Sequence, residues 1–153
     1  MVVLDASVIL KWFYPPELEP HSDVALQFRQ RFLDGHLTVL IPSFAIYECA
    51  SSMHHSHYRL PPPTVRGRIR DLWRLPFTVK RLTRRVLWRA TEMAAAYGRK
   101  DRKLSVYDAY YFAVARFGQC PCVTADRRAY SHVKRIPWIH LLRDVSDVSI
   151  YDD

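Results

Sequence analysis

Four acidic residues are the side chains of this sequence best suited to chemistry, because each lies in or directly beside an apolar stretch. They are Asp5, Glu48, Asp108 and Asp126. Carboxylate oxygens are hard ligands, which suit Mg²⁺ or Mn²⁺ and suit Zn²⁺ poorly. Bound divalent ions lower the pKa of water, align it and neutralise charge on a phosphate. If the fold gathers these acids, the chemistry that they predict is metal-dependent hydrolysis of a phosphodiester.

Asp5 is the most informative of the four. It follows the apolar run Val2–Leu4, and a second apolar run starts just beyond it. This pattern predicts an acid at the carboxyl end of a buried strand, where open α/β sheets place their ligands. The alternative is a helix N-cap. Ser7 could supply a hydroxyl to the site, and its presence excludes aspartyl phosphotransfer of the haloacid-dehalogenase kind, which needs a second Asp at that position.

Glu48 and Asp108 are predicted to lie on helices. Few charges flank Glu48, and an acid in so apolar a stretch is rarely buried without a partner, although an exposed helix face is an equal alternative. Asp108 follows Ser105 by three residues, a spacing that also fits a capping box. A long apolar run follows Asp108, so we expect this helix to be central, with its positive end behind the carboxylate.

Asp126 follows Thr124 and precedes Arg127 and Arg128. A helix cap explains this position as well as a metal ligand does. In the functional interpretation, Asp126 faces the metal and the two arginines are available for phosphates.

Strands and helices alternate along the chain, which predicts a single three-layer α/β domain with a parallel sheet and helices on both faces. We expect strands at residues 2–4, 37–41, 77–82, 120–124 and 138–142, and helices at 22–34, 43–54, 64–75, 83–97 and 105–117. Glycines are predicted to close three of these helices, at Gly35, Gly98 and Gly118. If the first and fourth strands are neighbours, Asp5 and Asp126 flank the same edge of the sheet.

The net charge and the number of cysteines limit the class of protein to which the chain can belong. A net charge of +8 and a pI near 9.7 favour a polyanionic partner, although a merely basic domain is the plain alternative. The three cysteines, Cys49, Cys120 and Cys122, fit neither a disulfide framework nor a zinc ribbon and are expected to be buried thiols. No signal peptide and no membrane-spanning run is visible, so we expect a cytoplasmic protein.

Residues 1–143 are predicted to form the domain, and residues 144–153, with four aspartates and no Lys or Arg, a solvated acidic tail. Pro61–Pro63 is interpreted as a stiff connector within the domain. His54, His55 and His57 have no accompanying metal-site pattern, and an exposed helix end is favoured for them.

Basic segments at 66–70, 81–89 and 99–103 form either solvated helix faces or, with interleaved aromatic residues, a groove for single-stranded RNA. The groove is favoured because residues 99–103 lead into the helix that carries Asp108. The apolar residues of these basic helices are an alternative contact for a protein partner. The candidate RNA-binding residues are Arg99, Lys100, Arg102, Lys103, Arg127 and Arg128.

The sequence resembles the PIN-domain ribonucleases, and most of all the VapC-type toxins of prokaryotic toxin–antitoxin pairs. The resemblance covers nearly the whole chain. It rests on residues 3–9, on Pro42 with Glu48 six residues later, on residues 104–111 and on residues 123–128.

This resemblance implies an acidic quartet of Asp5, Glu48, Asp108 and Asp126 that binds Mg²⁺ or Mn²⁺, with Ser7 and Thr124 as hydroxyl helpers. It also implies a sheet in the order 3-2-1-4-5, a homodimer, an RNA substrate and a cognate antitoxin. One departure is Cys49–Ser52, where relatives often carry Asn. The alternatives are a catalytically silent RNA- or antitoxin-binding module and a housekeeping nuclease of RNA maturation.

Overall fold

The computed structural model describes residues 1–14, 17–55, 60–98 and 103–153. Five parallel strands form one sheet in the order β3-β2-β1-β4-β5, as predicted. They are β1 (Val2–Leu4), β2 (Val39–Pro42), β3 (Thr78–Lys80), β4 (Cys122–Thr124) and β5 (Ile139–Leu141). In register, Val3 lies beside Leu40 on one side and Cys122 on the other. The strands β1 and β4 are therefore neighbours, and Asp5 and Asp126 follow their carboxyl ends.

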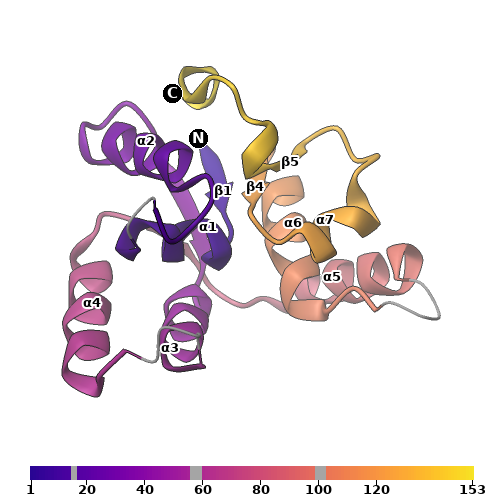
Figure 1. Cartoon of the computed structure of the whole chain (residues 1–153). Helices are drawn as coiled ribbons and strands as arrows, with labels where there is room; N and C mark the ends of the chain where they lie inside the picture. The colour runs from indigo at the N-terminus through magenta and orange to yellow at the C-terminus, as the bar shows by residue number, and fades with distance from the viewer. Residues whose placement is uncertain (15–16, 56–59, 99–102) are drawn as a thin grey trace.

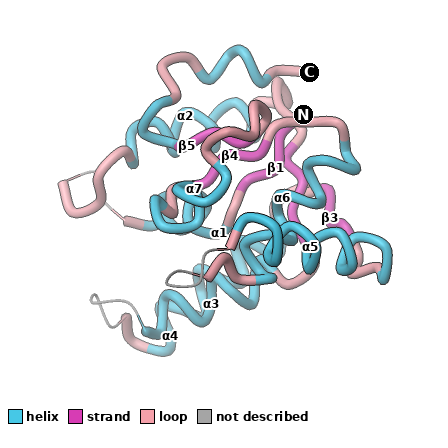
Figure 2. Tube along the Cα trace, turned by 90° about the vertical axis from the view of Figure 1, so that its right-hand side faces the viewer, coloured by secondary structure: helices cyan, strands magenta, loops and turns pink. Residues whose placement is uncertain are grey.

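Helices lie on both faces of the sheet, which confirms the predicted α/β class. They are α1 (Ala6–Leu10), α2 (Ser22–Leu33), α3 (Ala45–His55), α4 (Pro62–Arg74), α5 (Arg84–Tyr97), α6 (Val106–Gly118) and α7 (Arg127–Val133). Short 3₁₀ turns add η1 (Lys11–Phe13), η2 (Leu142–Asp144) and η3 (Val148–Tyr151). Figure 1 shows α1 and α2 on one side of the strands and α5 and α6 on the other. The turned view of Figure 2 agrees, with the strands lying between α2 and α5.

The central helix is α6, which packs on β1, β2 and β4 and is covered in turn by α5. Its residues 109–115 are all buried, because its sequence is apolar on almost every side. The expectation that Gly118 closes this helix was wrong. Gly118 is the last helical residue, and Gln119 takes the left-handed conformation at φ 51°. A Cβ on Gly118 would lie 3.2 Å from the Cys120 Sγ atom and 3.4 Å from the Leu40 Cδ2 atom, so a larger residue here would have to displace these side chains by a few tenths of an ångström.

Other boundaries follow local chemistry. Gly35 does take the left-handed conformation after α2, at φ 77°. Gly98 follows α5 with an extended backbone. The triple proline is less of a connector than expected, since Pro62 and Pro63 form the first turn of α4. Proline suits this place because its fixed φ is helical and its missing N–H would have had no helical partner.

The expectation that residues 144–153 form a solvated tail was wrong for Val145, Val148 and Tyr151, although six of the other residues are exposed. Val148 and Tyr151 are each only 3% exposed, and the Tyr151 ring lies 5.1 Å from that of Phe28. The Nε atom of Arg31 donates to the Asp152 carboxylate at 2.6 Å. The N-terminal amine donates to the Tyr151 carbonyl at 3.0 Å. The last ten residues are therefore packed against α2 and the start of β1.

All three cysteines are free and buried, as predicted. Across the ranges that the structure describes, no helix has the length and apolar character needed to cross a membrane.

Candidate active site

Asp5 lies at the carboxyl end of β1 and also caps α1, so both interpretations of its position are correct. It is only 5% exposed. Two hydroxyls donate to its Oδ2 atom, that of Ser7 at 3.0 Å and that of Thr124. The Ser7 backbone N–H donates to Oδ1 at 3.3 Å. The fold thus holds this carboxylate through donors from α1 and from β4.

The same two hydroxyls connect Asp5 with the loop after β4. The Ala125 N–H donates to the Ser7 Oγ atom at 2.9 Å, and the Asp126 N–H donates to the Thr124 Oγ1 atom at 3.1 Å. Ser7 and Thr124 therefore fix the position of Asp126 relative to Asp5. Because β1 and β4 are adjacent parallel strands, the residues that follow them meet at the same edge of the sheet.

Asp126 is the N-cap of α7. Its Oδ1 atom accepts from the Arg128 N–H at 2.7 Å and from the Ala129 N–H at 3.0 Å. The Oδ2 atom takes no part in the cap and lies 3.7 Å from the Arg128 guanidinium. One oxygen thus caps the helix, and the other lies near the Arg128 guanidinium.

Glu48 stands in the first turn of α3, half-buried. The Tyr111 hydroxyl donates to its Oε2 atom at 2.8 Å. Burial raises the pKa of Tyr111 well above its ordinary value, so this phenol stays protonated as a donor. Tyr111 is fully buried on α6, one turn after Asp108, and it couples α6 to the acid on α3.

Asp108 begins α6, whose N-cap is Ser105. The Ser105 Oγ atom accepts from the Asp108 N–H at 3.0 Å. Burial raises the pKa of Asp108, hydrogen bonds from Ser105 to its carboxylate oppose this rise, and the NH2 atom of Arg128 lies 3.5 Å from Oδ2. The capping interpretation is therefore correct for both Ser105 and Asp108, and the same carboxylate also contacts Arg128.

The charges of neighbouring acids influence the pKa values of Asp5, Glu48 and Asp108. Burial raises the pKa of Asp5 to about 6, and the charge of Asp108 adds to the effect. Burial raises the pKa of Glu48 to about 7, with further contributions from Asp5, Asp108 and Asp126. Burial also raises the pKa of Asp108, reinforced by Asp126 and opposed by Arg128. Such mutual repulsion within one site is typical of carboxylates that serve a cation or a proton.

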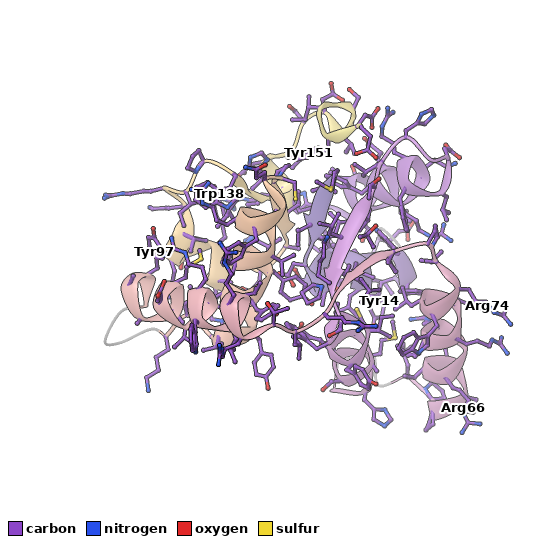
Figure 3. All side chains as sticks on the ribbon, turned by 180° about the vertical axis from the view of Figure 1, so that it is seen from behind. Tyr14, Arg66, Arg74, Tyr97, Trp138 and Tyr151 are labelled. Atoms are coloured by element: carbon purple, nitrogen blue, oxygen red, sulfur yellow. The ribbon has the colours of Figure 1, made fainter. Side chains whose placement is uncertain are left out.

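Among the candidate RNA-binding residues, those that the structure describes lie in different places. Arg128 is 63% exposed and bridges Asp108 and Asp126. Arg127 lines a separate cavity beside Ala125. Lys103 is exposed, whereas Arg99, Lys100 and Arg102 lie outside the described residues. His54 is exposed near the end of α3, and His57 lies outside the described residues. On α4, Arg66 and Arg74 point away from the helix into solvent (Figure 3).

Sequence reasoning missed Tyr111 as part of this site. The available signal was its spacing, because residues three apart on a helix share a face and Asp108 is three residues earlier.

Comparisons with known proteins agree with this architecture. The family model for the PIN domain matches residues 2–136. No curated protein gives a significant match. FitAcB from Neisseria gonorrhoeae superposes with a TM-score of 0.68 at 14% identity, over 95% of this chain and 100% of that chain. VapC20 of Mycobacterium tuberculosis, described as a Sarcin-Ricin loop cleaving toxin, gives a TM-score of 0.62 at 14% identity, over 86% and 95%. VapBC2 from Rickettsia felis, bound to a DNA fragment from its promoter, gives 0.61 at 15% identity, over 92% and 97%.

The structural similarities establish the fold, and the family match spans most of the chain. Proteins with this domain are generally nucleases. The order of strands, the sequence stretches around the acids and the match over residues 2–136 all lead to one assignment. The chain belongs to the PIN-domain family.

Proposed function

We propose that this protein is a metal-dependent endoribonuclease that hydrolyses phosphodiester bonds of RNA with Mg²⁺ or Mn²⁺. The observation that supports the proposal is the electrostatic influence of the four acids on one another, seen in the pKa values of Asp5, Glu48 and Asp108, in a chain of the PIN family. The proposed catalytic residues are Asp5, Glu48, Asp108 and Asp126, with Ser7 and Thr124 in support.

The donor set fits a hard divalent cation. All four groups offer carboxylate oxygens, and Asp5, Glu48 and Asp108 have raised pKa values because burial and neighbouring acids disfavour their charged forms. Within the described ranges, no three acids, histidines or cysteines already stand close enough to enclose an ion. The carboxylates would therefore have to move closer together for an ion to bind, and the exposed Arg128 would leave Asp108 and Asp126.

The proposed catalytic residues have different roles. Asp5 and Asp108 would hold the ion, while Glu48 and Asp126 would complete the acidic group and orient water. Ser7 and Thr124 keep Asp5 in one rotamer through their hydrogen bonds. A bound ion supplies charge for the scissile phosphate and lowers the pKa of the attacking water.

The test is cleavage of single-stranded RNA by the purified protein with Mg²⁺ or Mn²⁺, and again with excess chelator. Asp108→Asn should lose at least about 100-fold in rate while keeping its circular dichroism spectrum, since a ligand is removed and no core contact is. Asp71→Asn is a matched control, because Asp71 is an exposed acid on α4, 61% accessible. Folded wild-type protein that cuts no RNA across a broad panel would favour a catalytically silent RNA- or antitoxin-binding module.

We further propose that the protein is the toxin of a toxin–antitoxin pair and forms a homodimer. Support comes from an apolar cavity of about 400 Å³ between α5 and α6, lined by Leu82, Leu87, Tyr107 and neighbouring residues. Leu82 and Tyr107 are 58% and 67% exposed. Large apolar side chains that are exposed together are typical of a surface that binds another protein. Val106 and Tyr107, which line the cavity, directly precede Asp108 in the first turn of α6, so a protein segment seated there could extend to the acids.

A small protein encoded beside this gene should then inhibit cleavage. Leu87→Glu should weaken that inhibition at least about tenfold and leave cleavage itself intact, since Leu87 lines the cavity and contacts none of the acids. Unchanged cleavage with no inhibitory neighbour would favour a housekeeping nuclease. The molecular mass of the purified protein in solution, measured by light scattering, tests for the homodimer.

A further inference from the structure

A second cavity, of about 250 Å³, lies beside the acidic residues on the far side of Ala125. Its rim carries basic side chains from four separate parts of the chain. They are Lys11, His21, Arg127 and Arg143. Its apolar lining includes Leu141 and Leu142, which are buried at the end of β5. We propose that this cavity binds a phosphate of the RNA strand next to the one that is cut, and we call it the cationic pocket.

The charge of the cationic pocket favours an anion. Lys11 forms an ion pair with Glu19 at 2.8 Å, and Arg143 with Asp144 at 3.3 Å. Arg127 has no acid within ion-pair distance among the residues that the structure describes. Three permanent cations thus face two acids, before any charge on His21. An unpaired guanidinium at such a rim suits bidentate contact with phosphate oxygens.

The size of the cationic pocket limits what it can hold. Pockets for whole drug-sized ligands have volumes of roughly 300–1,000 Å³. A cavity of about 250 Å³ suits one phosphate with part of its sugar, which would lie on Leu141 and Leu142.

The position of the cationic pocket relates it to the acids. Ala125 lines the pocket, its N–H donates to Ser7 of the acidic site, and the next residue is Asp126. Lys11 directly follows α1, which Asp5 caps. A strand that places one phosphate at the acids would therefore pass Ala125 and reach the pocket. The acids themselves repel RNA, so nearby cations are needed to hold the neighbouring phosphates.

The wall that carries Lys11 and His21 is held firmly. The Trp12 indole N–H donates to the Ala25 carbonyl at 2.8 Å, joining η1 to α2. His21 has a left-handed backbone, with φ 62°, although it is not glycine. The Ser22 hydroxyl donates to the Glu19 carbonyl at 2.8 Å and fixes this turn. A strained residue persists only where its surroundings hold it, so His21 has a defined place on the rim.

The inference rests on the proposed RNA substrate, and binding in excess chelator tests it without cleavage. The probe is a fluorescent single-stranded oligoribonucleotide, measured by anisotropy over a series of salt concentrations. Arg127→Ala and Arg143→Ala should each weaken binding about tenfold and reduce the slope of log K against log salt by roughly 0.7, the value for one lost phosphate contact on a single strand. Arg29→Ala, which removes an exposed charge on α2, should bind within twofold of wild type.

Oligonucleotides with a 5′-phosphate and a 5′-hydroxyl distinguish the source of the phosphate. If the pocket variants lose the same affinity for both probes, the pocket binds an internal phosphate. If they lose affinity only for the probe with the 5′-phosphate, the pocket binds the phosphate at a strand end. Wild-type protein that fails to bind RNA, or pocket variants that behave like Arg29→Ala, would overturn the proposal. If the pocket variants bind RNA more weakly but the wild type shows no metal-dependent cleavage, only the proposed nuclease activity is refuted. If the wild type cleaves RNA but the pocket variants bind it as well as Arg29→Ala does, only the phosphate-binding pocket is refuted.

Discussion

At the scale of single residues, the site places negative charge where the surrounding protein disfavours it. Asp5 is almost fully buried, and its pKa of about 6 means that at neutral pH it is ionised at a cost in folding free energy. A buried carboxylate that destabilises the fold in this way is typical of a functional site, because a neutral group in its place would stabilise the fold.

Asp5→Asn should therefore stabilise the metal-free protein at pH 8 while abolishing cleavage. The difference between the ordinary pKa of 3.8 and about 6 corresponds to a gain on the order of 2–3 kcal/mol in the free energy of unfolding. Urea denaturation in chelator at pH 8 and pH 5 measures it, and the gain should be smaller at pH 5, where Asp5 is largely protonated. A variant that is less stable than wild type at pH 8 would refute this account of Asp5.

Tyr111→Phe should lower the affinity for Mn²⁺ by about tenfold, because Glu48 loses the hydroxyl that orients it. Calorimetric titration with Mn²⁺ provides the measurement. Tyr110→Phe is the control, since the Tyr110 hydroxyl accepts from the Thr83 N–H and has no hydrogen bond to an acid. Equal affinities in the two variants would show that the Tyr111 contact does not matter for the site.

At the scale of elements, helix starts position two of the acids. Ser105 caps α6 and holds the turn that carries Asp108, while Asp126 is itself the cap of α7. The structural and chemical roles of these residues overlap, which explains why the sequence alone could not separate a cap from a ligand.

Ser105→Ala and Thr83→Ala form a matched pair. Each removes the side-chain cap of one helix, α6 or α5, and should cost about 1 kcal/mol of stability. Only Ser105→Ala should also slow cleavage when both variants are assayed well below their melting temperatures, because only α6 carries an acid of the site. Equal activities would mean that the start of α6 does not position Asp108.

The segment η3 belongs to the core, contrary to the expectation of a solvated tail. Tyr151→Ala should cost about 3 kcal/mol, as for other buried aromatic side chains. Ile150→Ala, one residue earlier and 69% exposed, should change stability by less than about 0.5 kcal/mol. Denaturant unfolding compares them, and a difference near zero would mean that η3 is not packed in solution.

The elements also show how far sequence could go. Buried strands that end in acids, and helices with strong caps, were predictable because local pattern determines them. The failures concern tertiary packing. Gly118 lies close to β2, and Tyr151 is buried by α2, and neither contact is local. Arg127 and Arg128 were both expected to be available for phosphates, and local pattern could not show that they lie in different places. Successive helical residues point about 100° apart, so one lines the cationic pocket and the other contacts the acids.

At the scale of the whole molecule, the protein is basic overall and acidic at its proposed centre. This arrangement attracts a polyanion and then requires a cation to bring it to the acids. Metal, protons and Arg128 would compete for the same carboxylates.

The metal-free protein should consequently lose stability as pH rises from about 4 to about 7. Asp5 and Glu48 have folded pKa values of about 6 and 7, above their ordinary values of 3.8 and 4.5. The folded state thus holds their protons more tightly than the unfolded chain, and this stabilisation is present below the ordinary pKa and lost once pH exceeds the folded pKa. Melting temperatures in chelator measure it, and added Mn²⁺ should raise them more at pH 8 than at pH 5. A melting temperature that climbs between pH 5 and 7.5 in chelator would contradict the raised pKa values.

The most direct test of the central claim is the rate of Mn²⁺-dependent cleavage of one single-stranded RNA by four isosteric variants. They are Asp5→Asn, Glu48→Gln, Asp108→Asn and Asp126→Asn. If the four acids form one metal-dependent site, every variant stays folded and loses at least about 100-fold in rate, with Asp71→Asn unchanged. Cleavage at the wild-type rate by any two of the folded variants would contradict a shared site.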